Sequence, residues 1–238
     1  MERTLIKDLR GKIDQTVKLQ GWLQTLRDQK KMQFLILRDP TGLVQVAHWK
    51  PNDEILASNI ASLGAETALT IIGKVIDNPV VKLNQLEVQL ESLVVENLAE
   101  SPLPFDPFAE TLPALDYRLD WRYMDLRRAY NNLLFQVQTT MEMAMREYWL
   151  KHDFIEIHSP KLMGTPSESG AELFSLDYFE RKAYLAQSPQ FYKQMAMAAG
   201  FERIFEIGPV FWSDPSFTAR HMTEFTGVAL QISWINSA

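Results

Sequence analysis

The chain has 238 residues, of which 46% are hydrophobic and 23% charged, as in a globular protein with one large or two modest domains. Its 30 acidic residues outnumber 24 basic ones, so a contact with nucleic acid requires a local basic patch. The chain has no cysteine, which excludes disulfides and thiolate metal sites, and no apolar run approaches the ~18 residues of a membrane span. We expect a cytoplasmic protein that does not enter a membrane.

Residues 16–95 contain short segments rich in Val, Ile, Leu and Trp, which predict β-strands separated by turns. A tight turn suited to a hairpin is expected at residues 39–42, Asp-Pro-Thr-Gly. One helix follows the third strand, with Asn52 as its expected N-cap and Gly64 at its end. Five strands with a helix after the third is the order of an OB-fold barrel, which binds single-stranded nucleic acid on one face.

Residues 101–125 form a segment whose first half carries Pro102, Pro104, Pro107 and Pro113. Proline removes backbone donors and stiffens the chain. We therefore expect a linker or hinge that holds the barrel at a fairly fixed distance from the residues that follow.

A long helix is predicted over Ala129–Lys151, where apolar residues recur at steps of three and four. Its methionines are expected to fill a core. Residues 154–158 predict a strand that ends before Pro160, because proline cannot donate to a central ladder. His152 and His158 lie nearby, but no third ligand stands at a zinc-like spacing, so we expect structural roles and no metal site.

A second helix is predicted after residues 183–187, with Ser188 as its N-cap, Pro189 at its first position and Gly200 at its end. Lys193 lies near the start of this helix. A cation that faces a pocket pairs more strongly with a carboxylate than with a neutral amide.

Residues 203–212 and 228–234 predict two further strands. The loop between them holds the turn residues 213–216 and the donors of Arg220 and His221. A long loop on a sheet with an arginine at its far side is a place to hold an anion such as a phosphate.

The string GPVFWSDPSFTARHMTEFT resembles motif 2 of class II aminoacyl-tRNA synthetases, and most closely the aspartyl-tRNA synthetases of archaeal type, which also occur in bacteria. Upstream, HDFIEIHSPKL resembles motif 1, PSESGAELF the substrate-covering loop and AYLAQSPQFYKQM the aspartate-binding segment. A series of matches in this order, over nearly the whole chain, is far more specific than a lone glycine fingerprint.

The resemblance implies an all-β OB-fold barrel that binds an anticodon at residues 1–100, a linker at 101–125, and the first part of a class II catalytic domain at 126–238. That domain is expected to be α+β, with a mixed, mainly antiparallel sheet, and incomplete at its C-terminus. The implied reaction activates L-aspartate with ATP and Mg²⁺ to aspartyl-adenylate and transfers aspartate to tRNA(Asp), with tRNA(Asn) left open as a second acceptor. A homodimer through the motif 1 region is implied as well.

The resemblance also implies roles for single residues. Aspartate is expected to contact Glu168, Ser188, Gln190 and Lys193; ATP is expected to contact Asp214, Arg220, His221 and Met222. In the barrel, Phe34 is expected to stack on an anticodon base while Arg27 and Gln45 contact others. For Phe34 strand packing is an alternative, residues 27–31 also suit a solvated hairpin tip, and Glu168 also suits a surface acid in a loop.

The chain departs from the family pattern at three positions. Trp212 stands where motif 2 has an arginine that bridges the α-phosphate and the amino acid's carboxylate, and Ala229 and Gln231 stand where the family has acids. The sequence also ends before the glycine-rich third motif. We therefore expect a truncated or degenerate form with little activity, with no confident catalytic residue. Two alternatives are a non-catalytic OB-fold paralogue that binds tRNA and a relative of the asparaginyl enzymes, which Lys193 disfavours.

Overall fold

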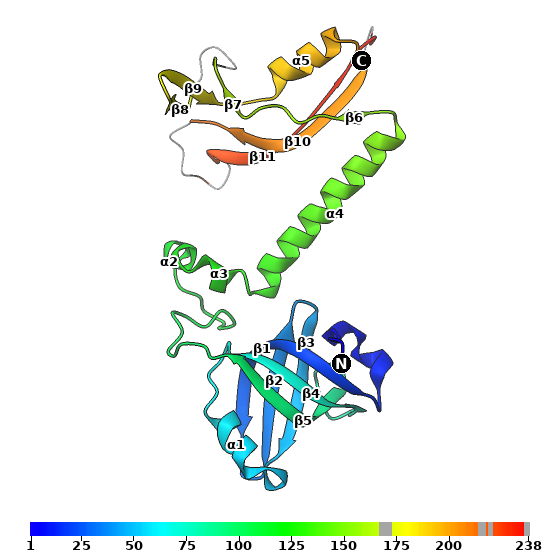
Figure 1. The fold of residues 1–238 in the computed structure, drawn as a ribbon, viewed down its shortest axis with the longest axis vertical. Helices are drawn as coiled ribbons and strands as arrows, with labels where there is room; N and C mark the ends of the chain where they lie inside the picture. Colours follow the sequence, from blue (N-terminus) through cyan, green and yellow to red (C-terminus); the bar gives the residue numbers. More distant parts are fainter. Residues whose placement is uncertain (167–172, 214–217, 219–220, 236–238) are drawn as a thin grey trace. The chain divides into compact units, whose positions relative to one another are not determined.

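The computed structural model describes residues 1–166, 173–213, 218 and 221–235. The chain divides into two compact units, residues 1–121 and 122–238, which are described separately (Figure 1). Among the described residues, no helix has both the length and the apolar composition that a membrane crossing requires.

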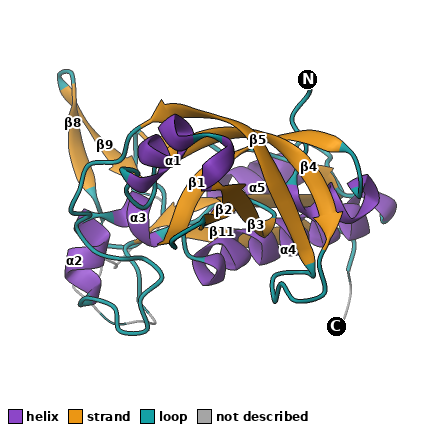
Figure 2. Cartoon of the chain, turned by 90° about the horizontal axis from the view of Figure 1, so that it is seen from below, coloured by secondary structure: helices purple, strands orange, loops and turns teal. Residues whose placement is uncertain are grey.

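The first unit is a closed barrel of five strands in the order β1-β2-β3-β5-β4, which confirms the predicted OB fold. The strands are β1 (Thr16–Asp28), β2 (Met32–Asp39), β3 (Gly42–Trp49), β4 (Ala68–Asp77) and β5 (Leu86–Asn97). Neighbours pair antiparallel except β3 and β5, which pair parallel. The helix α1 (Glu54–Ala61) follows β3, as expected, and is drawn in purple beside the orange strands in Figure 2.

The N-cap of α1 is Asp53, and the expectation of Asn52 was wrong. The Asp53 carboxylate accepts a hydrogen bond from the backbone N–H of Leu56 at 2.8 Å. Asn52 instead ends the short 3₁₀ helix η2 (Lys50–Asn52), because Pro51 starts that turn with its fixed φ. The helix also ends earlier than Gly64, with Ser62 as its C-cap.

The barrel interior is filled by alternate strand residues, as a closed barrel requires. The fully buried side chains include Leu19, Leu23, Leu35, Leu37, Val46, Ile71 and Val88. The 3₁₀ helix η1 (Ile6–Lys12) adds Ile6 and Leu9 to this core. Asp39 fixes the predicted β2–β3 turn, because one carboxylate oxygen accepts from the N–H groups of Thr41 and Gly42 and the other from the N–H of Ile6.

The proline-rich segment packs against the barrel. Arg38 forms a bidentate ion pair with Glu66, with both N···O distances at 2.7 Å. The guanidinium carbon of Arg38 lies 4.5 Å from the ring centroid of Phe108. Phe105 is buried and meets Tyr117 of α2 (Leu115–Asp120) edge-on. Residues 101–121 therefore belong with the barrel unit.

Phe108→Ala should loosen this segment, because it removes the ring from the Arg38 guanidinium. A cation–π contact of this kind contributes about 1 kcal/mol, which corresponds to roughly a fivefold change in the opened population. Limited digestion with a non-specific protease should cut residues 101–113 correspondingly faster. Leu98→Ala is the control, since Leu98 is 63% exposed. Equal cleavage rates in the two variants would contradict the account.

The second unit combines two small sheets with α3 (Arg122–Asp125), α4 (Ala129–Lys151) and α5 (Gln190–Ala198). The first sheet has the order β11-β10-β6, from β6 (Ile155–Glu156), β10 (Arg203–Phe211) and β11 (Glu224–Ile232). The second has the order β7-β9-β8, from β7 (Leu162–Met163), β8 (Ser175–Tyr178) and β9 (Arg181–Leu185). All pairs are antiparallel except β6 with β10. This arrangement confirms the predicted α+β class with mixed sheets.

Helix α4 has the predicted bounds, but the expectation that its methionines fill a core was wrong for Met141 and Met143, whereas Met145 is half-buried. Met141 is 51% exposed and Met143 is 65% exposed, and Asn131 is the one buried residue among those described in the helix. Near its end, Trp149 packs on Phe205 with ring centroids 4.6 Å apart. Sequence periodicity shows that a helix has an apolar face, but it does not show what covers that face.

Candidate active site and nucleic-acid interface

Helix α5 carries two of the predicted aspartate-binding residues, and its neighbour Ser188 is the third that the structure describes. Pro189 takes the N-cap position that was expected of Ser188, and the helix begins at Gln190. The Ser188 hydroxyl accepts the N–H of Gln190 at 3.3 Å. Gly200, with a φ of +94°, follows the helix as predicted. Gln190 is exposed, whereas Lys193 is buried with 7% of its surface accessible.

Lys193 is the buried lysine of α5. Its ammonium lies 3.4 Å from the backbone oxygen of Leu230 in β11. Burial lowers the pKa of Lys193 below its usual range, and the nearby charge of Glu206 acts in the opposite direction. The Lys193 side chain therefore reaches the sheet, and the carboxylate of a ligand bound there would balance its positive charge.

Glu206 in β10 is a buried carboxylate that sequence reasoning missed. One oxygen accepts hydrogen bonds from the Lys161 ammonium at 2.5 Å, from the Ser159 hydroxyl at 3.0 Å and from the Ser159 N–H at 3.2 Å. Across the β10–β11 ladder its register partner is Ala229, one of the departures from the family pattern. The available signal was an acid inside the otherwise apolar run 204–210.

Trp212 is held in place by its neighbours. Its indole N–H donates to the backbone oxygen of Gln187 at 3.0 Å, and its ring meets Phe225 edge-on with centroids 5.2 Å apart. The indole is an uncharged single donor, and here that donor is already in use. Trp212 therefore cannot replace a bidentate guanidinium at this position.

Three of the predicted site residues, Glu168, Asp214 and Arg220, lie outside the described residues. His221 and Met222 are described, and both are exposed. The Nδ1 atom of His221 lies 2.9 Å from the Thr218 hydroxyl. Within the described part of the chain, no three acidic or histidine side chains gather in a way that could hold a metal ion.

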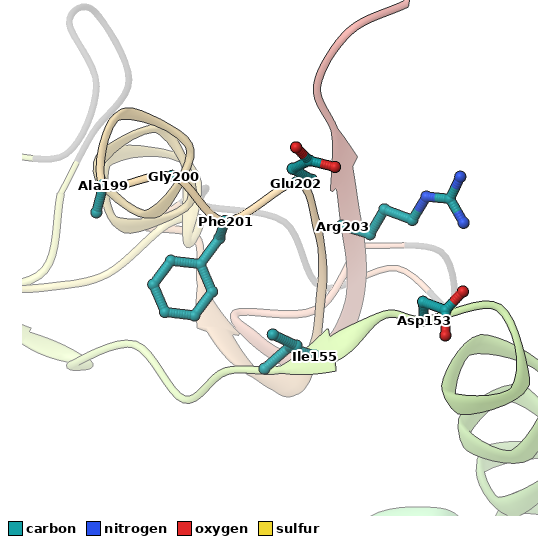
Figure 3. A pocket seen from close by; sticks show the side chains of 7 residues that line it. All are labelled: Asp153, Ile155, Ala199, Gly200, Phe201, Glu202 and Arg203. Atoms are coloured by element: carbon teal, nitrogen blue, oxygen red, sulfur yellow. The ribbon is translucent and has the colours of Figure 1, made fainter.

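A hollow of about 560 Å³ lies at the C-terminal end of α5 (Figure 3). It is lined by Asp153, Ile155 and residues 199–203. Arg203 at its wall donates to the backbone oxygen of His152 at 2.9 Å. The hollow shares no residue with the predicted aspartate, ATP or anticodon sites, although Asp153 and Ile155 lie in the motif 1 string.

On the barrel, the structure brings the three predicted anticodon residues together. Arg27 and Phe34 are register partners on β1 and β2, and the guanidinium carbon lies 5.5 Å from the phenyl centroid. Arg27 donates to the side-chain oxygen of Gln45 at 2.9 Å. The Gln45 amide nitrogen donates in turn to Glu87 of β5 at 2.6 Å. Glu87 was missed, because only the β3–β5 pairing places it beside Gln45.

Comparison with known proteins places each unit. Residues 17–96 match the OB-fold nucleic acid binding domain family. Residues 114–238 match the family of class II tRNA synthetases (D, K and N). The chain therefore belongs to the class II tRNA synthetases of this group.

The relatives that it resembles include two named aspartate ligases. The chain is 40% identical to the aspartate–tRNA(Asp) ligase of Picrophilus torridus, over 98% of the chain and 54% of that protein. It is 42% identical to the aspartate–tRNA(Asp/Asn) ligase of Methanocaldococcus jannaschii, over 95% of the chain and 52% of that protein. The chain thus spans about half the length of the curated relatives it matches.

Solved structures show the same fold. The asparaginyl-tRNA synthetase of Pyrococcus horikoshii, in complex with asparaginyl-adenylate, superposes with a TM-score of 0.90 at 30% identity, over 99% of this chain and 54% of that one. The aspartyl-tRNA synthetase of Entamoeba histolytica superposes with a TM-score of 0.83 at 29% identity, over 100% and 51% respectively.

Proposed function

We propose that the chain supplies the anticodon-binding barrel and the first part of the catalytic domain of an aspartate–tRNA ligase, with tRNA(Asp), L-aspartate and ATP as substrates. The observation that carries this proposal is the cluster of Arg27, Phe34, Gln45 and Glu87 on one face of a closed OB barrel. A second candidate acceptor is tRNA(Asn), because the names of the relatives include ligases for tRNA(Asp) and for tRNA(Asp/Asn).

The geometry of this cluster suits a single unstacked base. Phe34 is half-buried, and its strand neighbours Gln33 and Leu35 are fully buried, so strand alternation places Phe34 on the outer face of the barrel, where a base can stack on its ring. Gln45 is oriented on both sides, because its oxygen accepts from Arg27 and its nitrogen donates to Glu87. A fixed amide beside a stacking platform can read the hydrogen-bonding edge of that base.

Phe34→Ala should weaken binding of tRNA(Asp) to the chain by about 1–3 kcal/mol, the usual contribution of one base–aromatic stack. Fluorescence anisotropy with a labelled tRNA(Asp) transcript measures this loss, and binding by the unaltered chain should weaken steeply as salt rises. Val80→Ala is the matched control, since Val80 is an apolar barrel side chain that is 88% exposed. Unaltered affinity in Phe34→Ala, or binding that is insensitive to salt, would overturn the proposal for the barrel.

The catalytic unit supports the aspartate assignment through Lys193. A buried ammonium gains more from the side-chain carboxylate of aspartate than from the neutral amide of asparagine. ATP in this family is expected to carry Mg²⁺, which proteins usually hold through one or two carboxylates together with the phosphates. Among the described residues no group of three acidic or histidine side chains gathers that could hold the ion without ATP. The role proposed for this unit is to bind the amino acid: Ser188, Gln190 and Lys193 orient L-aspartate.

We further propose a homodimer through the motif 1 region and a cytoplasmic location. Support for the dimer comes from α4, where Leu133, Leu134, Val137 and Met141 are each more than half exposed. Contiguous exposed apolar surface on this scale is typical of an interface. The absence of cysteine fits a reducing compartment.

A second candidate is a protein that binds tRNA without activating an amino acid. Trp212, Ala229 and Gln231 favour it, because each replaces a charged family residue with a neutral one. Formation of aspartyl-adenylate separates the two candidates. An asparaginyl enzyme is the third, and the buried charge of Lys193 disfavours it.

A further inference from the structure

Glu206 is a deeply buried charged group of the catalytic unit that has no role in the proposed function. It is 2% exposed on the strand β10. One carboxylate oxygen accepts three hydrogen bonds, from Lys161 and Ser159. The other oxygen, Oε2, is buried and has no hydrogen-bond partner among the described residues. A buried charged oxygen without a partner is costly, so its presence calls for a compensating charge nearby.

Two lysines supply that charge from different elements. Lys161, from the segment between β6 and β7, donates to Glu206 at 2.5 Å. Lys193, from α5, is buried, and its ammonium lies 3.4 Å from the backbone oxygen of Leu230. The residue next to Leu230 on β11 is Ala229, which pairs with Glu206 across the ladder, and the charge of Glu206 acts to raise the pKa of Lys193. The strand β11 contributes only neutral side chains to the same face, Ala229 across from Glu206 and Gln231 two residues further on. Two ammonium groups and one carboxylate leave one surplus positive charge in the cluster.

The backbone is shaped around this cluster. At Gly208, an added β-carbon would lie 3.2 Å from the Glu206 oxygen and 3.6 Å from the Lys161 ammonium. Because glycine has no side chain, Gly208 leaves space for the Glu206–Lys161 ion pair. Gln231 has a buried side-chain oxygen that is also without a partner among the described residues. The face beneath α5 is thus polar and incompletely satisfied.

We propose that Glu206 is a positioning residue of the amino-acid pocket: its carboxylate holds Lys161 aside and keeps Lys193 an ammonium, ready for the side-chain carboxylate of a dicarboxylic amino acid. This role deepens the proposed function and rests on it for the identity of the ligand. It also makes Glu206 a determinant of the choice between aspartate and its neutral amide.

The physical reason is the balance of charges around Lys193. Burial already lowers the pKa of Lys193. Without the carboxylate, the cluster would hold two ammonium groups and no anion, and Lys193 would give up its proton more easily. A neutral amine has no electrostatic preference for a carboxylate over an amide. The single charge of Glu206 therefore decides whether the pocket can discriminate.

The direct test is the titration of Lys193 in the full chain. Lysine labelled with ¹³C at Cε gives one NMR signal for each side chain, and Lys193→Met identifies the signal of interest. In Glu206→Gln the pKa of Lys193 should fall by about one unit or more, and in Lys161→Met it should rise, because a competing cation is removed. A merely structural role for Glu206 would not produce shifts of opposite sign.

Glu224→Gln is the matched control, since Glu224 is an exposed acid on β11 and should leave the titration of Lys193 unchanged. An unchanged or raised pKa of Lys193 in Glu206→Gln would overturn the inference. Circular dichroism checks that each variant is folded. If Glu206→Gln does not fold, the direction of the shift in Lys161→Met decides: a rise supports the inference, and no change overturns it.

Calorimetry then tests the ligand. L-Aspartate should bind Glu206→Gln about tenfold more weakly than the unaltered chain, while the weaker binding of L-asparagine should not change. Equal losses for both amino acids would overturn the role in discrimination. Failure of the unaltered chain to bind L-aspartate would contradict the proposed function instead, and the titration of Lys193 would still decide the role of Glu206.

Discussion

The 238-residue chain should catalyse no detectable aspartate-dependent exchange of pyrophosphate into ATP, and Trp212→Arg should not restore it. In the family pattern, an arginine at position 212 bridges the α-phosphate and the amino acid's carboxylate. Trp212 instead donates its one N–H to the backbone of Gln187. Loss of one such charged donor costs on the order of 10²-fold in rate.

The single substitution should fail because several parts act on one transition state. By the family resemblance, Ala229 and Gln231 stand where acids are expected, so two further groups beside Trp212 are neutral. Residues that act as a unit are strongly non-additive, so restoring one of them recovers little.

The control for this assay is the full-length ligase of Picrophilus torridus, which should exchange under the same conditions. Robust exchange by the unaltered chain would refute the inactive interpretation. If exchange appears only in Trp212→Arg, then Trp212 alone accounts for the missing activity.

Gly73→Ala should destabilise the barrel by about 3 kcal/mol, the upper part of the usual range for a forced overpacking. Gly73 lies at an irregularity in the β4–β5 ladder. A β-carbon there would lie 2.3 Å from the backbone oxygen of Gln89 and 2.8 Å from a methyl carbon of Val88. Both neighbours belong to β5, so the substitution must force the two strands apart.

Urea unfolding of the full chain, followed by the fluorescence of its tryptophans, measures this loss in the barrel transition. Gly11→Ala is the matched control, since its added carbon would meet nothing within 4 Å. It should change the free energy of unfolding by less than about 0.5 kcal/mol. Equal free energies of unfolding for Gly73→Ala and Gly11→Ala would contradict this prediction, and would show that β4 and β5 accommodate the added carbon by a small local shift.

The sequence predicted elements best where one residue type controls local geometry. The bounds of α4 follow from a long apolar periodicity, and the turn at 39–42 follows from Asp39, whose carboxylate accepts the N–H groups that the turn leaves free. The cap of α1 was misplaced by one residue because both Asn52 and Asp53 suit an N-cap, and only the 3₁₀ turn at Pro51 separates them.

From the sequence, family motifs propose site residues, but contacts that tertiary pairing creates stay hidden. Glu87 reaches Gln45 only through the parallel β3–β5 pairing, and Glu206 meets Lys161 across 45 positions of sequence. Neither contact leaves a periodic signal. Burial of Lys193 and exposure of α4 depend in the same way on which elements pack against them.

The most direct measurement compares the affinity of the full chain for tRNA(Asp) with its affinity for the same tRNA carrying a substituted anticodon. The Arg27–Phe34–Gln45 face should read the anticodon bases, so the substituted tRNA should bind at least about tenfold more weakly. Phe34→Ala should weaken the binding of both tRNAs, because stacking does not depend on the identity of the base, whereas Gln45→Ala should reduce the difference between them. Equal affinity for the two tRNAs in the unaltered chain would contradict the account.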